Sequence, residues 1–371
     1  MKALRAVLML PILAVAGHAG NLPPVQTVFV ILLENHNWSS FKGSPDAPFI
    51  NGTLLPLASH CEKYYNPPGL HPSEPNYLWL EAGTNFGIFD NNDPAINHQN
   101  TTNHLVTQLR SAGISWKAYQ EDIGGDVVPL TAINGYAPRH NPFVFFDDVT
   151  GTNNPEDAYG LAHIRPCSEL AGDLTNNSVA RYNFITPNLC DDGHDSCAPW
   201  DNPVRQTDDW LAANVPQILA STAYSNNGAV FITWDEGGNG SDGPIGMILL
   251  SPLARGGGYG NDIYYTHSSF LRTMQGIFGV SPWLGDAANA TDLSDLFMQL
   301  TFDSAGMNAN GAFCLNITGV RPGSTNFVEA STNFVTWNVI STNWGSSNSF
   351  SFSDNTATNQ HSQFYRVREA W

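Results

Sequence analysis

Positively charged residues are scarce in this chain of 371 residues. It has 15 Lys and Arg against 33 Asp and Glu, which gives a formal net charge of −18 at pH 7. Binding to nucleic acid or to an anionic membrane surface requires a basic face, so we expect neither as a partner. Only 13% of the residues are charged while 42% are hydrophobic, which argues against disorder and for a sizeable core. A chain this acidic can still bind phosphate if a metal ion supplies local positive charge.

No segment is long and apolar enough to be a transmembrane helix. The apolar run at residues 7–15 is too short to span a bilayer. Lys2 and Arg5 precede it and small residues follow it at 17–20, which is the pattern of a secretory signal. We therefore expect residues 1–20 to be a signal peptide, the mature protein to be secreted or periplasmic, and no stable membrane insertion.

Cysteine is also sparse, with five residues and no Cys-x-x-Cys pair. The missing pair argues against cysteine as a metal ligand, and an exported protein can keep disulfides instead. Cys190 and Cys197 bracket a short polar segment, so we predict a bridge between them. A Cys61–Cys167 bridge is a weaker alternative, and the odd count leaves at least one thiol free.

Apolar runs rich in β-branched residues alternate with segments of helical periodicity. Such alternation predicts an α/β protein, a three-layer α/β/α sandwich with a mostly parallel central sheet. The expected strands are 27–33, 114–119, 181–185, 229–234 and 247–250, and the expected helices are 104–109, 209–219 and 268–278.

The composition changes after about residue 305, where Gly, Asn, Ser and Thr become frequent. Short alternating runs at regular spacing there predict a small all-β, sandwich-like domain at 312–371, although a partly ordered tail is the alternative. We therefore expect a signal peptide at 1–20, a catalytic domain at 21–303, a linker at 304–311 and this β domain.

Carboxylates follow two of the expected strands directly. Glu34 comes after the first, and the pair Asp235 and Glu236 comes after the fourth. Neighbouring carboxylates repel each other unless a proton or cation lies between them, and their oxygens suit divalent metal ions. Because ligands gather at the carboxyl ends of parallel strands, we predict a metal site there, with Asn35 as a further ligand or a donor to phosphate. The structural alternative is an acidic turn.

Ser73 lies between two prolines, Pro72 and Pro75, which restrict the backbone around its hydroxyl. A serine is a weak nucleophile until a metal ion or an adjacent base activates it, and His71 is a nearby base. The alternative is a helix cap, because serine is a favoured residue at a helix start. Both roles are compatible, since a helix N-terminus also favours phosphate.

Four further residues have the chemistry of a second metal site or of a general acid for the leaving group. They are Asp192, His194, Asp195 and His267. Six other histidines, His36, His60, His98, His104, His140 and His163, remain unassigned at this point.

Taken together, these motifs resemble the phosphoesterase family of bacterial phospholipases C and acid phosphatases, in the alkaline-phosphatase-like superfamily. The resemblance covers roughly residues 25–300. The motifs that carry it are Glu34-Asn35, His71-Pro-Ser73-x-Pro-Asn76-Tyr77, Asp191-Asp192-Gly-His194-Asp195, Asp235-Glu236-Gly-Gly and Tyr265-Thr-His267.

The resemblance implies which residues act. One divalent metal ion is expected among Glu34, Asn35, Ser73, Asp235 and Glu236, with a second possible at Asp192, Asp195 and His267. Ser73 is the expected nucleophile, through a phosphoserine intermediate. His267 is expected to assist the leaving alcohol as an acid, and His194 is a further expected catalytic residue. Asn35, His71, Asn76 and His194 are the expected substrate-binding residues.

The reaction that we predict is hydrolysis of a small phosphate ester by a secreted, metal-dependent acid phosphatase. A phospholipase C acting on a phospholipid diester is the first alternative. A non-enzymatic surface or carbohydrate-binding protein is the second, because the C-terminal region is rich in aromatic residues. A sulfatase is disfavoured because the arginine of its motif is missing, and a serine esterase because no Gly-x-Ser-x-Gly surrounds Ser73.

Overall fold

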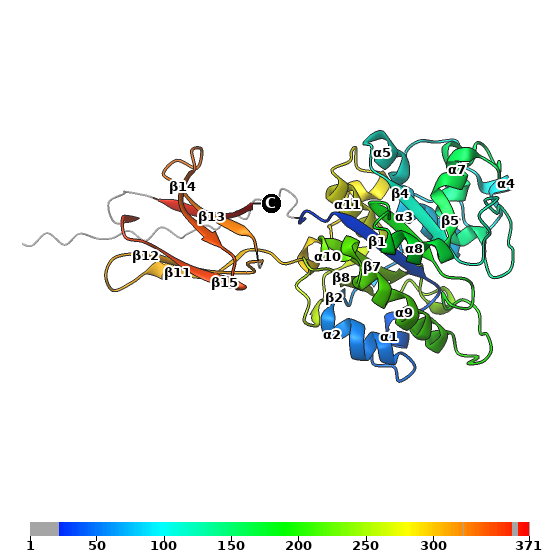
Figure 1. The fold of residues 1–371 in the computed structure, drawn as a ribbon, viewed down its shortest axis with the longest axis horizontal. Helices are drawn as coiled ribbons and strands as arrows, with labels where there is room; N and C mark the ends of the chain where they lie inside the picture. Colours follow the sequence, from blue (N-terminus) through cyan, green and yellow to red (C-terminus); the bar gives the residue numbers. More distant parts are fainter. Residues whose placement is uncertain (1–21, 322, 358–362, 371) are drawn as a thin grey trace, which may run out of the picture.

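The structure is a computed structural model that describes residues 22–321, 323–357 and 363–370. The predicted signal peptide lies outside these residues. Figure 1 shows a large α/β unit, coloured from blue to yellow, and a small β unit, coloured from orange to red. Among the described residues, no helix combines the length and apolarity needed to cross a membrane.

The large unit is built on an eight-stranded sheet in the order β5-β4-β6-β1-β7-β8-β2-β9. The first five of these strands run parallel, β8 is antiparallel to both of its neighbours, and β2 and β9 pair in parallel. The strands are β1 (Thr27–Leu33), β2 (Ser59–Cys61), β4 (Trp116–Gln120), β5 (Ile164–Pro166), β6 (Tyr182–Thr186), β7 (Gly228–Trp234), β8 (Met247–Leu250) and β9 (Tyr259–Asn261). A separate parallel pair joins β3 (Tyr64–Tyr65) to β10 (Tyr265–Thr266). The mostly parallel sheet confirms the predicted fold class.

Helices cover both faces of this sheet (Figure 1). The helix α3 (Ser73–Ala82) packs with α5 (Leu105–Ser111) and α11 (His267–Phe278), whereas α8 (Leu170–Thr175) and α10 (Thr222–Ser225) pack with α9 (Pro203–Leu219). The other short helices are α1 (Trp38–Phe41), α2 (Leu55–Leu57), α4 (Pro94–Asn97), α6 (Asp147–Thr150) and α7 (Ala158–His163). The helix predicted at 209–219 therefore begins earlier than expected, because Asn202 caps it and Pro203 starts it.

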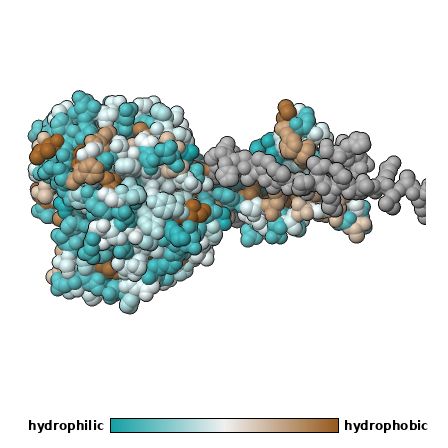
Figure 2. Space-filling view, turned by 180° about the vertical axis from the view of Figure 1, so that it is seen from behind, coloured by the Kyte–Doolittle hydropathy of each residue, from teal (hydrophilic) through white to brown (hydrophobic). Residues whose placement is uncertain are grey.

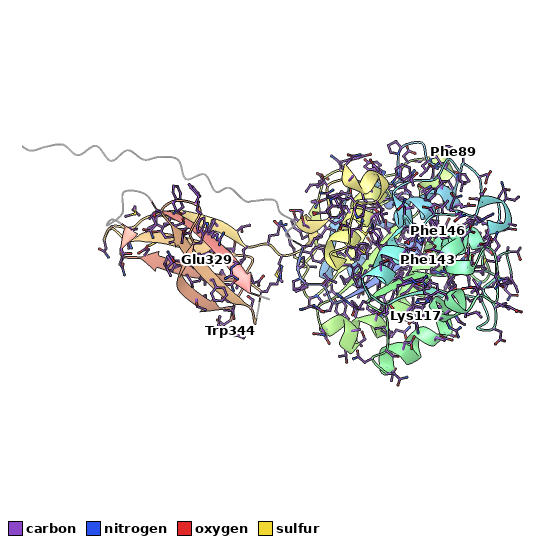
Figure 3. The ribbon with its side chains drawn as sticks, turned by 90° about the horizontal axis from the view of Figure 1, so that it is seen from above. Phe89, Lys117, Phe143, Phe146, Glu329 and Trp344 are labelled. Atoms are coloured by element: carbon purple, nitrogen blue, oxygen red, sulfur yellow. A yellow bond between two sulfur atoms is a disulfide. The ribbon has the colours of Figure 1, made fainter. Side chains whose placement is uncertain are left out.

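The core of the large unit is aromatic as well as aliphatic. Strands β1 and β7 are buried almost throughout, as their uninterrupted apolar sequence predicts. Phe143 and Phe146 are fully buried beside them, whereas Phe89 lies at the periphery and is 65% exposed (Figure 3). The face seen in Figure 2 is largely hydrophilic on this unit, with separate small apolar spots.

The small unit has its own core and two antiparallel three-stranded sheets, in the orders β11-β12-β15 and β14-β13-β16. Its strands are β11 (Thr301–Met307), β12 (Phe313–Thr318), β13 (Thr325–Ser331), β14 (Asn338–Trp344), β15 (Ser349–Asp354) and β16 (Phe364–Ala370). A small all-β unit is therefore present, as predicted. The segment 304–311 is not a linker, because most of β11 lies in it and pairs with β12.

Candidate active site

The register of the central sheet brings the two predicted carboxylate motifs together. Leu33 of β1 pairs with Trp234 of β7, so Glu34 and Asp235 leave neighbouring strands side by side. The backbone amide of Asn35 donates to Asp235 Oδ1 at 3.0 Å, and it does so from a left-handed backbone conformation with φ of 47°. The amide of Glu34 donates to the carbonyl of Asp192 at 2.8 Å, which anchors the loop after β6 to the same place.

Ser73 is the first residue of α3, and its hydroxyl points away from its own helix. The Oγ atom donates to Glu34 Oε2 at 3.0 Å, and a further hydrogen bond to Asp235 opposes the rise in the pKa of that carboxyl. No side chain caps the start of α3. Of the two interpretations of Ser73, the geometry therefore matches a hydroxyl held in the carboxylate cluster, and not a helix cap.

The structure adds His140, which sequence reasoning had left unassigned. Its Nε2 atom lies 3.3 Å from Glu34 Oε2, the oxygen that also accepts from Ser73, and its Nδ1 atom lies 3.1 Å from Asp192 Oδ2. Glu34, His140 and Asp192 are all buried, and their ligand atoms lie within 4.8 Å of one another. No local motif marks His140, which is the last residue of a short 3-10 turn more than 100 residues from Glu34 in the chain.

The electrostatics of this cluster are unfavourable without a cation. Burial raises the pKa of Glu34 well above its usual range, and the charges of Asp235 and Asp192 raise it further. Burial likewise raises the pKa of Asp192, raises that of Asp235 to about 8 with help from Glu236, and raises that of Glu236 to about 7. Burial lowers the pKa of His140 well below normal, which leaves the imidazole neutral, the form that binds metals.

Several atoms in the cluster have no hydrogen-bond partner. Asp235 Oδ2, His140 Nε2 and Asn35 Oδ1 are buried and unsatisfied, which is costly unless another group binds them. These donors suit a divalent cation, since they combine carboxylate and amide oxygens with one imidazole nitrogen. A metal ion therefore fits the residues present. Glu34, Ser73 and Asp235 would hold it on one side, and Glu34, His140 and Asp192 on the other.

Glu236, His71 and Asn76 form a second layer beside this cluster. Glu236 Oε2 accepts from His71 Nδ1 at 2.6 Å and from Asn76 Nδ2 at 3.2 Å. The other ring nitrogen of His71 lies 3.0 Å from Asp242 Oδ1. His71 thus bridges two carboxylates, so both of its nitrogens are already engaged and neither faces Ser73 as a base.

His267 also has both ring nitrogens engaged. Its Nε2 donates to the carbonyl oxygen of Asp235 at 2.5 Å, and Tyr64 donates its hydroxyl to Nδ1 at 3.2 Å. Burial lowers the pKa of His267 to about 4. Neither ring nitrogen of His267 is free in this structure, and its expected roles as an acid and as a metal ligand stay predictions. His267 supports the backbone of Asp235.

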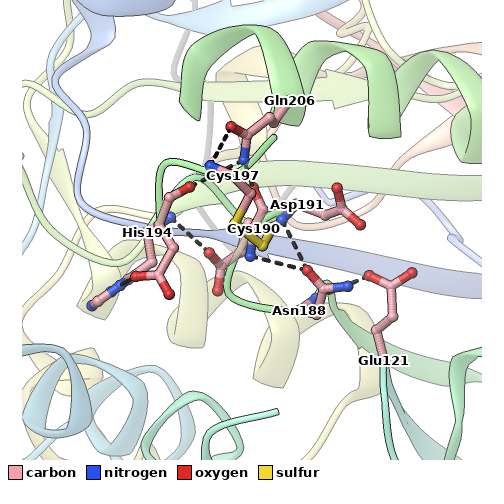
Figure 4. The surroundings of a disulfide bond; sticks show 9 residues. Glu121, Asn188, Cys190, Asp191, His194, Cys197 and Gln206 are labelled. Carbon is pink, nitrogen blue, oxygen red and sulfur yellow. Dashed lines mark hydrogen bonds and ion pairs between the residues drawn. A yellow bond between two sulfur atoms is a disulfide. The ribbon is translucent and has the colours of Figure 1, made fainter. Parts of the chain in front are cut away.

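His194 and Asp195 lie at the rim of the site, in the loop closed by the predicted Cys190–Cys197 disulfide, which is formed (Figure 4). His194 Nδ1 lies 2.7 Å from Asp195 Oδ1, and Asp195 is too exposed to join the buried ligands. Gln206 fastens the same loop through Cys190 and Cys197.

The alternative Cys61–Cys167 bridge is not formed. Cys61 ends β2 near one edge of the sheet, whereas Cys167 follows β5 at the opposite edge. The two thiols are therefore separated by the width of the sheet.

A serine hydroxyl held among buried carboxylates at the carboxyl edge of a mostly parallel sheet is the arrangement of a hydrolase that acts on esters. The family model described as Phosphoesterase family matches residues 58–281, which is more than half of the chain. The chain belongs to this family and is a hydrolase of phosphoester bonds.

Three curated relatives are similar to the chain in sequence. A phosphatidylinositol-3-phosphatase of Mycobacterium tuberculosis is 29% identical over 279 residues, covering 75% of this chain and 85% of the relative. An acid phosphatase of Aspergillus niger is 31% identical over 229 residues, covering 58% and 50%. The phosphate-repressible acid phosphatase of Penicillium chrysogenum is 29% identical over 226 residues, covering 58% and 51%. The chain thus spans about half the length of these fungal relatives.

Solved structures are more distant. A protein in the alkaline phosphatase superfamily from Vibrio parahaemolyticus is 12% identical with a TM-score of 0.46, covering 86% of this chain and 83% of that chain. The human ectonucleotide pyrophosphatase / phosphodiesterase 5 is 10% identical with a TM-score of 0.49, covering 74% and 100%. We draw no argument from these two neighbours.

Proposed function

We propose that this protein is a phosphomonoesterase of the acid phosphatase type, with Ser73 as nucleophile and a divalent metal ion as cofactor. The main support is the hydrogen bond from Ser73 Oγ to Glu34 Oε2, inside a group of buried carboxylates with no Lys or Arg within ion-pair distance among the residues that the structure describes. The names of the relatives described above are all those of phosphatases, which favours monoesters as substrates.

In the proposed reaction, Ser73 Oγ attacks phosphorus in line with the leaving alcohol. The new bond joins Oγ to phosphorus, while the bond to the alcohol oxygen breaks and the alcohol leaves with that electron pair and takes up a proton. Glu34 Oε2 already accepts the Ser73 hydrogen bond, so it is the group that receives the serine proton. Water then hydrolyses the phosphoserine and restores the hydroxyl.

The rest of the site prepares this serine. Ser73 starts a helix of ten residues, whose N-terminal dipole favours an anionic phosphoryl group. Tyr77, one turn further along α3, donates to Glu34 Oε1 and so fixes the carboxylate that faces the serine. A divalent metal ion bound by these residues would supply the positive charge that favours ionisation of the serine and stabilises the phosphoryl oxygens.

A phospholipase C is the weaker candidate. A hollow of about 610 Å³ lies beside the loop before Ser73, and Trp79 and Phe89 line it together with Leu70. Most of its other lining residues are polar or small, among them Ser268, Ser269, Asp286, Asn289 and Thr291. The wall therefore mixes polar and apolar side chains, and neither Ser73 nor Glu34 lines it, so the hollow gives no support to a lipid diester over a monoester.

We further propose that the protein is exported. The N-terminal sequence has the pattern of a signal peptide, and the Cys190–Cys197 disulfide is typical of an oxidising compartment. Detection of the mature chain in the culture medium or periplasm, with an N-terminus near residue 21, is the expected result.

The first test is hydrolysis of an aryl phosphate monoester and of its phosphocholine diester by residues 21–371, with and without a chelator. We expect turnover of the monoester that a chelator abolishes and a divalent ion restores. Preference for the diester would move the function to phospholipase C. A protein that binds a metal ion but turns over neither compound would contradict the proposed substrate class.

The second test is Ser73→Ala, which removes the nucleophile and one buried hydrogen bond. We expect kcat to fall by about 10³-fold or more, because alanine offers no atom in place of the attacking Oγ. Acid quenching of the wild type during turnover of a labelled monoester should trap phosphate on Ser73, and the variant should trap none. Near-normal turnover by a folded Ser73→Ala protein would refute this role.

A further inference from the structure

Arg139 is a cation at the rim of the carboxylate cluster that no carboxylate pairs with. It occupies the turn Pro138–His140, directly before His140. Its recorded polar contact is to His194, and among the described residues no acidic group lies within ion-pair distance of it. Arg110, on α5, also lacks a carboxylate partner within the described part of the chain, but its guanidinium lies over the ring of Tyr159, whereas that of Arg139 lies against His194.

The hydrogen-bond chain behind Arg139 has a defined direction. A guanidinium only donates, so His194 Nε2 accepts from Arg139 Nη2 at 3.4 Å. The other ring nitrogen of His194 must then carry the proton, and it donates to Asp195 Oδ1 at 2.7 Å. The Cys190–Cys197 disulfide closes the loop that carries both residues. A chain of two hydrogen bonds therefore runs from Arg139 through His194 to Asp195, and it orients the guanidinium.

The geometry places this guanidinium beside the cluster. Arg139 directly precedes His140, and the ring of His194, which Arg139 contacts, lies 5.7 Å from the ring of His140 between centroids. Burial raises the pKa of Asp192, and the positive charge of Arg139 opposes that shift. Burial lowers the pKa of His140, and Arg139 lowers it further. Arg139 Nε is itself buried and has no hydrogen-bond partner, so part of the donor set remains free.

We propose that Arg139 binds the phosphoryl oxygens of the substrate and that His194, backed by Asp195, positions it. The proposal rests on the proposed function. A phosphate dianion approaching several buried carboxylates is repelled, and a guanidinium fork offers two parallel hydrogen bonds that offset this repulsion. His194, which the sequence had indicated as a substrate-binding and catalytic residue, is then a positioning residue.

The experiment compares the wild type with Arg139→Gln and Arg139→Lys in the metal-loaded full chain. Two quantities are measured, kcat/KM for an aryl phosphate and the inhibition constant of inorganic phosphate. For Arg139→Gln we expect kcat/KM to fall about 10- to 100-fold and the inhibition constant to rise about 10-fold or more, as for loss of a charged hydrogen-bond donor. Arg139→Lys keeps the charge but not the two parallel donors of the guanidinium. The inhibition constant of phosphate for this variant should therefore lie between those for the wild type and for Arg139→Gln.

Arg110→Gln is the matched control. Arg110 lies on α5, exposed, with its guanidinium over the ring of Tyr159. Its substitution removes the same charge away from the site, so both measured quantities should stay within about twofold of the wild type. Equal effects of Arg110→Gln and Arg139→Gln would reduce Arg139 to a contribution of net charge and overturn the proposal.

The positioning role is tested at His194. The side-chain oxygen of His194→Gln can still accept from Arg139, whereas His194→Phe cannot. We expect the glutamine variant to keep most of the phosphate affinity and the phenylalanine variant to lose about as much as Arg139→Gln. In the Arg139→Gln background, His194→Phe should add little, because the two act as one unit.

Failure of the proposed function and failure of the proposed role of Arg139 give different results. A wild type that turns over no phosphoester contradicts the proposed function. A wild type that is active and inhibited by phosphate, with an unchanged inhibition constant in a folded Arg139→Gln or Arg139→Lys protein, overturns this inference alone. Circular dichroism establishes folding, and the lysine variant, which keeps the charge, serves if the glutamine variant does not fold.

Discussion

Buried acidic residues of two kinds occur in this protein: those such as Glu329 in the small unit pair with basic side chains, and those of the active-site cluster in the large unit pair with no Lys or Arg among the described residues. In the small β unit, Glu329 accepts from Arg366 at 2.6 Å and lies 3.3 Å from Arg368 (Figure 3 labels Glu329). In the large unit, Glu34 and Asp235 lie beside each other, and among the described residues Glu34 has only the neutral His140 within ion-pair distance and Asp235 has no basic side chain there. Ion pairs such as those of Glu329 stabilise the folded state. Unpaired buried carboxylates such as Glu34 and Asp235 destabilise the folded state unless a ligand binds them.

The reason is the cost of desolvation. A buried carboxylate without a partner takes up a proton or destabilises the folded state, and here burial raises the pKa of Asp235 to about 8. Removing such a charge from a metal-free protein should help folding, whereas removing a paired charge should harm it. The comparison therefore predicts opposite signs for the same kind of substitution in the two units.

The largest expected effect is that of Asp235→Asn, which removes charge but keeps shape. We expect kcat/KM to fall by about 10³-fold or more and the bound metal to be lost, because a neutral amide is a poorer ligand than a carboxylate. At pH 8 the metal-free variant should be more stable than the metal-free wild type by about 1–3 kcal/mol. Activity, metal content and chemical denaturation are the measurements.

Asp209→Asn is its control, since Asp209 pairs with Arg205 on the surface of α9. It should change neither metal content nor activity, and its stability should stay within about 0.5 kcal/mol of the wild type. A metal-free Asp235→Asn protein that is less stable than the wild type would mean that the carboxylate is compensated within the protein, and the contrast between the units would disappear.

The next effect is the pH dependence of the chelated protein. Asp235 has a pKa of about 8 when folded and an ordinary value near 3.8 when unfolded. Between these values the native state binds a proton that the unfolded chain does not, so stability falls as pH rises from about 4 to 8. The loss is about 1.4 kcal/mol per pH unit for each such proton, and Glu236, with a folded pKa of about 7, adds to it below pH 7.

Saturating metal should reverse this trend. Bound metal displaces these protons, so metal binds more tightly and stabilises more as pH rises through the same range. Thermal melts at pH 5, 6, 7 and 8, with chelator and with metal, measure both slopes. Parallel slopes in the two series would contradict a metal site built from these carboxylates.

Several residues of the candidate site could be predicted from sequence because the signal for each lies in the few residues next to it in the chain. A carboxylate directly after a buried strand has a position fixed by the sheet, so placing Glu34 and Asp235 required only that β1 and β7 be neighbours. The serine between prolines and the short Cys190–Cys197 loop are local in the same sense. The general fold follows from the alternation of apolar runs and helical patterns, whereas the order of the strands is known only from the structure.

The rest depends on long-range packing. His140 lies on an irregular 3-10 turn, and nothing near it in sequence separates it from the other histidines. His267 was expected among the acting groups from the motif Tyr265-Thr-His267, whereas its burial, its lowered pKa and its two hydrogen bonds are known only from the structure. β11 was missed as a strand because its polar, glycine-containing sequence has little apolar alternation, and it forms by pairing with β12.

A smaller effect is expected from the disulfide, tested as Cys190→Ala with Cys197→Ala. The bridge closes a loop with a sequence separation of seven, so we expect a loss of about 2–3 kcal/mol in stability. In the variant Gln206 can still donate to the backbone carbonyl of residue 190, and this hydrogen bond still holds the loop. Activity should therefore fall by less than about tenfold. Cys314→Ser, at a free thiol of the small unit, is the control. A loss of activity as large as that of Asp235→Asn would mean that the disulfide builds the metal site.

The smallest effect on catalysis is expected from Glu329→Gln. The substitution leaves Arg366 and Arg368, which are about half exposed, without their shared acceptor, so stability of the small unit should fall by about 1–2 kcal/mol. Because the two units have separate cores, kcat/KM and metal content should remain at wild-type values. Denaturation followed by tryptophan fluorescence in 0.1 M and 1 M salt adds a check, since salt should weaken the wild-type pair and leave the variant little changed. A drop in turnover with this variant would show that the small unit supports catalysis, and the division between charges that stabilise the fold and charges that bind a ligand would no longer follow the two units.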